Sequence, residues 1–307
     1  MRLLFFKSCL SLHPRYWPTW LALAILFGIN QLPYRIQLKI GQYLGRCGLL
    51  VLKRFRTIAS TNLALCFPKQ SAAARKQLLR KHFESLGMGV VECAMAYWTA
   101  PHKLAGLLQI KGKEYLEQAI SKQQGTLMLS GHFTSLDLCG RLFSTVFPLH
   151  AVYREQTNLV IDRLLKKQRK HQSLQPIHRH AIRTIIQALK KNATLWYAMD
   201  QDYGAKHACF ASFFNILAAT ITIPSRYAKK TQAQALIVFY HRLPAAQGYQ
   251  AIIQPLAHDF QRLSAEQMAQ RFNQLLEQQI RHYPEQYLWI HRRFKTRPPG
   301  ETSFYAS

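Results

Sequence analysis

Acidic residues are scarce in this 307-residue chain, where 14 Asp and Glu stand against 41 Lys and Arg and give a formal net charge of +27. Such an imbalance predicts an acidic partner, which could be nucleic acid, anionic lipid or an acidic carrier protein, and charge alone does not choose among them. Cysteine is also sparse, and none of the six forms a C-x-x-C pair. This spacing disfavours a disulfide framework and indicates reduced thiols in a cytosol-facing protein.

Several motifs that identify common enzyme classes are missing. The chain has no P-loop, no dinucleotide fingerprint, no H-E-x-x-H and no G-x-S-x-G elbow, which disfavours nucleotide-dependent, zinc-peptidase and serine-hydrolase chemistry. His178, His180, His207 and Cys209 match no zinc spacing. We therefore expect neither a metal nor a cofactor.

One long uncharged stretch occurs near the N-terminus, at residues 16–34 between Arg15 and Arg35. As a helix it would extend roughly 28 Å, about one bilayer core, with tryptophans at one end as in an interfacial belt. Prolines and polar residues at both ends shorten its strongly apolar part, so a tilted span, a monotopic anchor and a signal-peptide core compete. We expect a retained membrane-anchoring helix within residues 1–34, with residues 35–307 forming one domain on the cytoplasmic face.

The rest of the chain alternates strand-like and helix-like segments. This alternation predicts an α/β fold with a mostly parallel central sheet flanked by helices. The expected strands are 126–129, 151–153, 194–199, 235–240 and 249–253. The expected helices are 35–53, 71–97, 133–142, 158–171, 181–191, 220–230 and 264–282, the last one opening with a capping box from Ser264 to Gln267.

Candidate chemistry lies where the strand at 126–129 ends. Ser130 and Gly131 break the strand, His132 follows, and Asp137 comes five positions later in the next helix. A carboxylate on one ring nitrogen fixes the tautomer of an imidazole, so that the other nitrogen can take a proton from a hydroxyl. The alternative is an ordinary turn histidine beside a helix-surface aspartate.

A second acidic feature follows the strand at 194–199. Asp200 and Asp202 lie in the loop after it, and the carboxyl ends of parallel strands are where functional groups collect in an open α/β sheet. Two carboxylates are conspicuous there because acids are so rare in this chain. The alternative is a local Asx turn or a salt bridge to neighbouring arginines.

Longer segments resemble the lipid A biosynthesis acyltransferases, the lauroyl and myristoyl transferases that add secondary chains to the lipid A precursor. The segments occur in family order over essentially the whole chain: HPRYWPTW at 13–20, NLALCFP at 62–68, FESLGMG at 83–89, WYAMDQDYG at 196–204 and EQYLWIHRRFKTRP at 285–298. The resemblance implies a membrane-anchored α/β acyltransferase that takes acyl chains from acyl carrier protein. It also implies an H-x4-D/E site at His132 and Asp137, with Arg169 and Asp200 nearby.

The resemblance has one departure, because its lipid A branch usually carries Glu where this chain has Asp137, whereas Asp is typical of glycerol-phosphate acyltransferases. We predict an O-acyltransferase of the bacterial inner membrane in which His132 deprotonates a hydroxyl of a lipid A precursor and Asp137 orients the ring. Arg169, Asp200 and Asp202 are expected to bind substrate, and Arg169 or backbone N–H groups after Gly131 to hold the oxyanion.

Two alternatives to this reading remain. One is a glycerol-phosphate or lysophospholipid acyltransferase that uses acyl-coenzyme A or acyl carrier protein. The other is a non-catalytic basic protein bound to membrane or nucleic acid, which leaves the His132 motif without a use. For the predicted enzyme, the partners are acyl carrier protein, the lipid A precursor and an anionic membrane, and no nucleic acid is expected.

Overall fold

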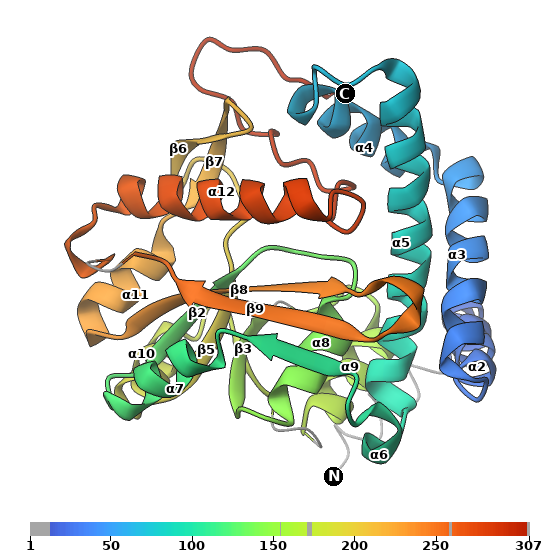
Figure 1. The fold of residues 1–307 in the computed structure, drawn as a ribbon, viewed down its shortest axis with the longest axis horizontal. Helices are drawn as coiled ribbons and strands as arrows, with labels where there is room; N and C mark the ends of the chain where they lie inside the picture. The colour runs from blue at the N-terminus through green and yellow to red at the C-terminus, as the bar shows by residue number, and fades with distance from the viewer. Residues whose placement is uncertain (1–12, 154, 171–173, 258–259, 306–307) are drawn as a thin grey trace.

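The computed structural model describes residues 13–153, 155–170, 174–257 and 260–305, and for residues 166–170, 174 and 261 it describes the backbone alone (Figure 1). At its centre is a seven-stranded sheet in the order β1-β9-β8-β2-β5-β3-β4. The strands are β1 (Leu108–Lys111), β2 (Thr126–Ser130), β3 (Leu149–Tyr153), β4 (Leu174–His178), β5 (Thr194–Ala198), β8 (Gln234–Arg242) and β9 (Tyr249–Pro255). All neighbouring pairs are parallel except β8 and β9, which confirms the predicted mostly parallel sheet.

Strand β2 occupies the middle of the sheet, between β8 and β5, and all five of its residues are buried. A strand covered on both faces needs a continuous apolar run rather than an alternating one, and Leu127, Met128 and Leu129 provide it. The register of the parallel pair places Ser130 of β2 opposite Ala198 of β5. The two segments that leave these strands therefore start at the same edge of the sheet.

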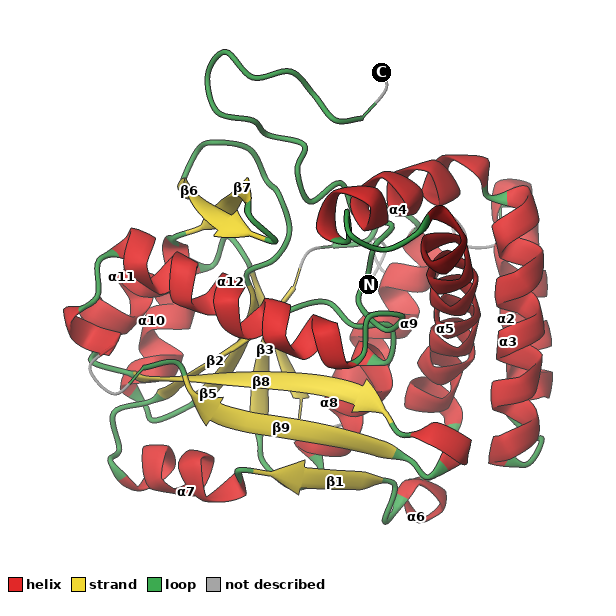
Figure 2. Cartoon of the chain, turned by 45° about the horizontal axis from the view of Figure 1, so that its top comes forward, coloured by secondary structure: helices red, strands yellow, loops and turns green. Residues whose placement is uncertain are grey.

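Helices cover both faces of the sheet (Figures 1 and 2). They are α7 (Lys113–Ser121), α8 (Leu136–Ser144), α9 (Leu159–Lys170), α10 (Ile182–Lys190), α11 (Ile223–Thr231) and α12 (Ala265–His282). One hydrophobic core joins α10, α11 and α12 to the sheet, and a second joins α7 and α8 to its other face. The predicted capping box of α12 is confirmed, with Ser264 and Gln267 bonding to each other's backbone N–H groups.

The N-terminal third is helical and contributes η1 (Pro14–Tyr16), α2 (Trp17–Ile29), α3 (Tyr34–Val51), α4 (Lys53–Cys66), α5 (Ala72–Trp98) and α6 (Pro101–Leu104). Figures 1 and 2 both show α2 and α3 outside α5, at the edge of the molecule. A Cβ atom at Gly45 of α3 would lie 2.0 Å from the carbonyl oxygen of Phe83 in α5. Any larger residue at 45 would therefore push these two helices apart.

The expected N-terminal membrane-anchoring helix is not supported by the structure. Among the residues that the structure describes, no helix is both long and apolar enough to cross a bilayer. Helix α2 has 13 residues, which extend about 20 Å against roughly 30 Å for a bilayer core. It is short because the chain turns after Asn30 and starts a separate helix at Tyr34.

Other differences from the sequence predictions concern short elements. The helix expected at 220–230 starts only at Ile223, because the preceding residues form β7 (Ile216–Ile221), which pairs with β6 (Ala208–Phe213) in an antiparallel hairpin. Strands β1 and β4 were also missed. They are the two edge strands of the sheet, and short, half-exposed edge strands lack the apolar run that identifies a buried one.

Candidate active site

His132 and Asp200 lie side by side at the carboxyl edge of the sheet. Each residue follows the end of its strand by two positions, and the Ser130–Ala198 pairing of β2 with β5 puts these two ends in register. Ser130 fixes the end of β2, since its hydroxyl donates to the carbonyl oxygen of Val238 in β8 at 2.7 Å. The position of the pair thus follows from strand register.

Both carboxylate oxygens of Asp200 face His132. Oδ1 lies 2.6 Å from Nδ1 of the ring, and Oδ2 accepts the backbone N–H of His132 at 2.8 Å. Asp200 is 2% exposed, whereas the side chain of His132 is 23% exposed. Because Nδ1 is occupied, Nε2 is the ring nitrogen left for an incoming hydroxyl.

This pairing shifts the protonation of both groups. Burial by itself lowers the pKa of His132, but the charge and hydrogen bond of Asp200, with a contribution from Asp137, raise it above the ordinary value. Burial by itself raises the pKa of Asp200, but the same contacts with His132, with a contribution from Arg293, hold it well below its usual range. The pair is therefore an ionised carboxylate beside a histidine of increased basicity.

Asp137 does not occupy the place that the sequence suggested. Its Oδ2 accepts from Sγ of Cys93 at 3.1 Å, and its Oδ1 lies 3.5 Å from the hydroxyl of Tyr97, so the carboxylate faces α5. Helix α8 starts only at Leu136, after a non-helical turn at 133–135. This turn directs Asp137 away from Nδ1, and the carboxylate bonded to the ring is that of Asp200.

A small cavity of about 90 Å³ lies next to this site. Asp137 is on its wall together with Trp196, whose ring meets that of His132 edge to face at 6.4 Å between centroids. Most of the remaining lining is apolar and comes from β3, α5 and α8. Trp196 and Tyr240 both line this cavity. Within the described part of the chain, the indole N–H of Trp196 and the hydroxyl of Tyr240 have no hydrogen-bond partner.

The segment that follows α12 holds the loop after β2. Leu288 donates its backbone N–H to the carbonyl oxygen of His132 at 3.0 Å, and Thr134 donates to that of Gln286 at 2.8 Å. These two bonds flank a bridge between Phe133 and Tyr287. The loop from His132 to Thr134 is therefore held by residues more than 150 positions away.

The same C-terminal segment holds the Asp200 loop through Asp202. Both carboxylate oxygens of Asp202 accept from Thr296, one from its backbone N–H at 2.6 Å and one from its hydroxyl at 2.7 Å. Oδ1 also accepts from Gly204 at 2.9 Å. Asp202 is buried and holds its loop to the C-terminal segment through these contacts, and its expected contact with substrate stays a prediction.

His291 belongs to this arrangement and was not singled out from the sequence. Its Nε2 accepts the backbone N–H of Asp202 at 3.1 Å, which requires that nitrogen to be unprotonated. Burial lowers the pKa of His291 to about 4, and the nearby Asp200 and His132 act on it in opposite directions. Only its place in the segment 285–298 could have pointed to it.

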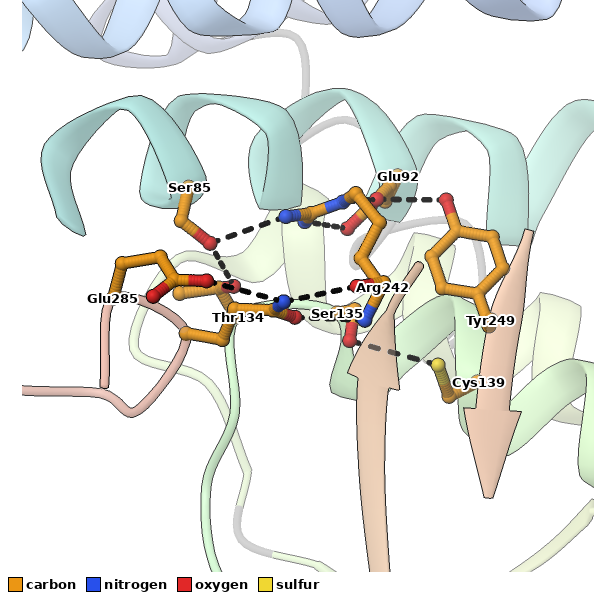
Figure 3. A network of polar contacts seen from close by, with 9 residues as sticks. Ser85, Glu92, Thr134, Ser135, Cys139, Arg242, Tyr249 and Glu285 are labelled. Carbon is orange, nitrogen blue, oxygen red and sulfur yellow. Dashed lines mark hydrogen bonds and ion pairs between the residues drawn. The ribbon is translucent and has the colours of Figure 1, made fainter. Parts of the chain in front are cut away.

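A buried ion pair between Arg242 and Glu92 is linked by hydrogen bonds to the loop that follows His132 (Figure 3). Arg242, at the end of β8, forms a two-pronged contact with Glu92 of α5, which also accepts from the hydroxyl of Tyr249 at 2.7 Å. Arg242 further donates to Ser85 at 3.1 Å, and the hydroxyls of Ser85 and Thr134 are 2.6 Å apart. The network thus reaches a residue two positions after His132.

Helix α5 lies so close to the loop after His132 that position 89 of the helix has no room for a side chain. A Cβ atom on Gly89 would lie 2.3 Å from the carbonyl oxygen of Thr134. Together with the ion pair, this contact fixes the distance between the helix and the loop.

The remaining candidates from the sequence are Arg169 and the possible metal ligands. Arg169 lies in α9, but its side chain is outside the part that the structure describes. Among the described residues, no three His, Cys, Asp or Glu side chains are arranged to share a metal ion. His132, Asp200 and Asp202 therefore lie at one edge of the sheet, with Asp137 on the adjoining cavity.

Comparisons with known proteins give one consistent result. The family model for bacterial lipid A biosynthesis acyltransferases matches residues 6–296. A lipid A biosynthesis palmitoleoyltransferase of Escherichia coli (strain K12) is 37% identical over 295 residues, which cover 96% of each chain. A lipid A biosynthesis lauroyltransferase of the same organism is 36% identical over 97% of this chain and 98% of its own. A lipid A biosynthesis acyltransferase of Haemophilus influenzae is 33% identical over 95% of this chain and 94% of its own.

Proposed function

This chain belongs to the bacterial lipid A biosynthesis acyltransferase family, and from that membership we propose that it moves a fatty acyl chain from acyl carrier protein to a hydroxyl of a lipid A precursor. The observation that supports a reaction at this site is the hydrogen-bonded pair of His132 and Asp200 at the sheet edge. A buried carboxylate on Nδ1 keeps the proton on that nitrogen and leaves Nε2 as the base.

In the proposed reaction, Nε2 of His132 takes the proton of the acceptor hydroxyl as its oxygen attacks the thioester carbonyl carbon. The tetrahedral intermediate then collapses, the C–S bond breaks, and the imidazolium returns the proton to the leaving thiolate. Asp200 stabilises the imidazolium between these steps through its ionised carboxylate. The acyl group thus passes directly from sulfur to oxygen without an acyl-enzyme.

The cavity beside His132 suits the part of the donor nearest to the reacting carbon. Its lining is mostly apolar, as an acyl chain requires. The unpartnered N–H of Trp196 is a hydrogen-bond donor that could meet the thioester oxygen, because an unsatisfied buried donor gains most from a polar ligand. We assign Asp137, on the same wall, the role of a second negative charge near the imidazolium, and Arg169 remains a candidate to bind substrate.

The acceptor class rests on the family. Asp137 by itself leaves glycerol phosphate or a lysophospholipid open as the acceptor, but the similar proteins are named for lipid A biosynthesis. We therefore propose a lipid A precursor as acceptor, with acylation on the cytoplasmic face of the inner membrane.

The helices at the N-terminus offer a surface for that membrane. None of the residues of α2 is buried, and Trp17 and Leu21 are each 64% exposed. Exposed apolar side chains continue on α3 at Ile36, Tyr43 and Leu44. A helix that is apolar all round and largely exposed fits an interfacial position in lipid, so we propose monotopic attachment through α2 and α3.

The direct test is acyl transfer by the purified full-length protein. Acyl carrier protein loaded with a fatty acid is offered together with a lipid A precursor or with glycerol 3-phosphate, and mass spectrometry follows each acceptor. We expect one acyl increment on the lipid A precursor, none on glycerol 3-phosphate, and none on either acceptor with folded His132→Ala. Acylation of glycerol 3-phosphate alone would contradict the proposed acceptor, and undiminished transfer by His132→Ala would contradict the proposed base.

A further inference from the structure

A second and larger cavity, of about 670 Å³, lies between α3, α5 and the turn that joins β8 to β9. It shares no lining residue with the cavity beside His132. Arg35, Leu38, Lys39 and Gln42 of α3 form one wall, and Ser85 and Met88 of α5 form the next. Its volume lies within the range of cavities that hold small ligands, roughly 300–1,000 Å³.

The polar part of this lining is cationic. Arg35 and Lys39 are one helical turn apart and exposed, and Arg242 is 6% exposed. Arg242 donates through Nε and Nη2 to Glu92 and through Nη1 to Ser85. Among the described residues, one of the two hydrogens on each Nη is therefore left without an acceptor. Glu285 is the carboxylate on the same wall. The cations therefore outnumber the acids around this space.

The rest of the lining is apolar and includes Leu38, Met88, Leu243 and Pro244. Ala245 and Ala246 of the turn both have positive φ, at 53° and 57°, a conformation that residues with a Cβ atom rarely adopt. The space thus combines a cationic rim with an apolar interior, as an amphiphile requires.

The rim also borders the exposed apolar surface of α3. At 100° per residue, Arg35 and Lys39 project between the cavity residues Leu38 and Gln42 on one side and the exposed Ile36 and Tyr43 on the other. Cations beside an apolar surface are placed to meet lipid headgroups. A free anion would not need the apolar surroundings.

We propose that this cavity is a second binding site, separate from the site of acyl transfer, for the phosphate-bearing headgroup of an anionic phospholipid. The phosphate lies between Arg35 and Lys39, because guanidinium and ammonium groups bind phosphate oxygens through charge-assisted hydrogen bonds. The first carbons of the lipid lie against Leu38, Met88 and Leu243. The cavity floor shares Ser85 and Arg242 with the network behind the His132 loop (Figure 3).

Cysteine protection tests this site without any measurement of activity. Gln42→Cys introduces a thiol on the cavity wall, and the native Cys47, which is exposed on the same helix and is not part of the lining, is the internal control. The rate of maleimide alkylation at each thiol is measured by peptide mass spectrometry in the full-length protein. The ligands are dihexanoyl phosphatidylglycerol, dihexanoyl phosphatidylcholine and inorganic phosphate, with the lipids below their micelle concentrations.

We expect phosphatidylglycerol to slow alkylation of the introduced thiol while Cys47 reacts at an unchanged rate. Adding Arg35→Gln and Lys39→Gln should raise the half-protecting concentration at least about tenfold, because both charge-assisted contacts with the phosphate are lost. Lys53→Gln with Arg54→Gln removes the same charge from exposed positions of α4 outside the lining and should change nothing. If Gln42→Cys does not fold, Met88→Cys places the reporter on the cavity wall formed by α5.

Four results would overturn the proposal. They are equal protection by phosphatidylcholine, equal protection by inorganic phosphate, parallel protection of Cys47, and an unchanged half-protecting concentration in the Arg35→Gln, Lys39→Gln variant. Any of the first three would mean a non-specific apolar contact or a simple anion site. The fourth would mean that Arg35 and Lys39 do not take part in binding.

Discussion

Asp200→Asn is expected to change the tautomer of His132, the proposed base, while the side chain at position 200 keeps almost the same volume. The backbone N–H of His132 can only donate, so the amide oxygen of the asparagine must replace the Oδ2 that accepts it at 2.8 Å. The amide NH₂ then faces Nδ1 of the ring, where Oδ1 now lies at 2.6 Å. Because the NH₂ donates, Nδ1 must accept, and the ring proton moves to Nε2, where it blocks the uptake of a proton from the acceptor.

The size of the effect follows from what is lost. General-base catalysis contributes roughly 10²- to 10⁴-fold, and the wrong tautomer removes it along with the charge that stabilises the imidazolium. We therefore expect kcat to fall by about 10² to 10⁴ with KM for the acyl donor nearly unchanged. Raising the pH should not restore the rate, since the fault lies in the tautomer and not in the protonation of His132.

The assay is steady-state acyl transfer with circular dichroism as a control for folding. Asp137→Asn is the matched variant, because it removes the same charge from a carboxylate that accepts from Cys93 and is not hydrogen-bonded to the ring. We expect it to lower kcat less than Asp200→Asn does. A folded Asp200→Asn variant with more than about a tenth of the normal rate, or a greater loss with Asp137→Asn, would refute the reasoning and return the orienting role to Asp137.

Further predictions concern the pH dependence of the reaction, the buried ion pair, helix α2 and helix α9. The neutral ring of His132 is the active form and its pKa is raised above 6.5, so kcat/KM should fall with decreasing pH from a midpoint above that of an ordinary histidine; a midpoint below 6.5 in a pH–rate profile would contradict this. Glu92→Gln leaves the buried charge of Arg242 without its partner and should lower the free energy of unfolding by about 3–5 kcal/mol in urea denaturation, whereas Glu92→Gln with Arg242→Met should recover much of that loss. Leu21→Ser with Ile25→Ser should lower the fraction of protein that sediments with neutral vesicles, and an unchanged fraction would place the membrane contact elsewhere than α2. Charge reversal at Lys166, Lys167 and Lys170 should reduce kcat/KM for acyl carrier protein more than for acyl-coenzyme A and lessen its dependence on salt; equal losses would exclude α9 as the docking face.

The sequence alone determined the class of fold and placed the candidate site residues at strand ends. The buried run of β2, the strand of β5 and the capping box of α12 are local signals, since each depends on residues within a few positions of one another. They were sufficient to place His132 and Asp200 at strand ends. The family was likewise evident from contiguous segments such as 196–204.

Only the tertiary structure decided which carboxylate meets His132. Five positions separate His132 from Asp137, yet the turn before α8 directs Asp137 toward α5, while the parallel register of β2 and β5 brings in Asp200 from 68 positions away. The hydrogen bonds that His291 and Thr296 form with Asp202, in the loop after Asp200, also join segments far apart in the sequence. Strand register and the packing of distant segments depend on the whole core, so no spacing along the chain encodes them.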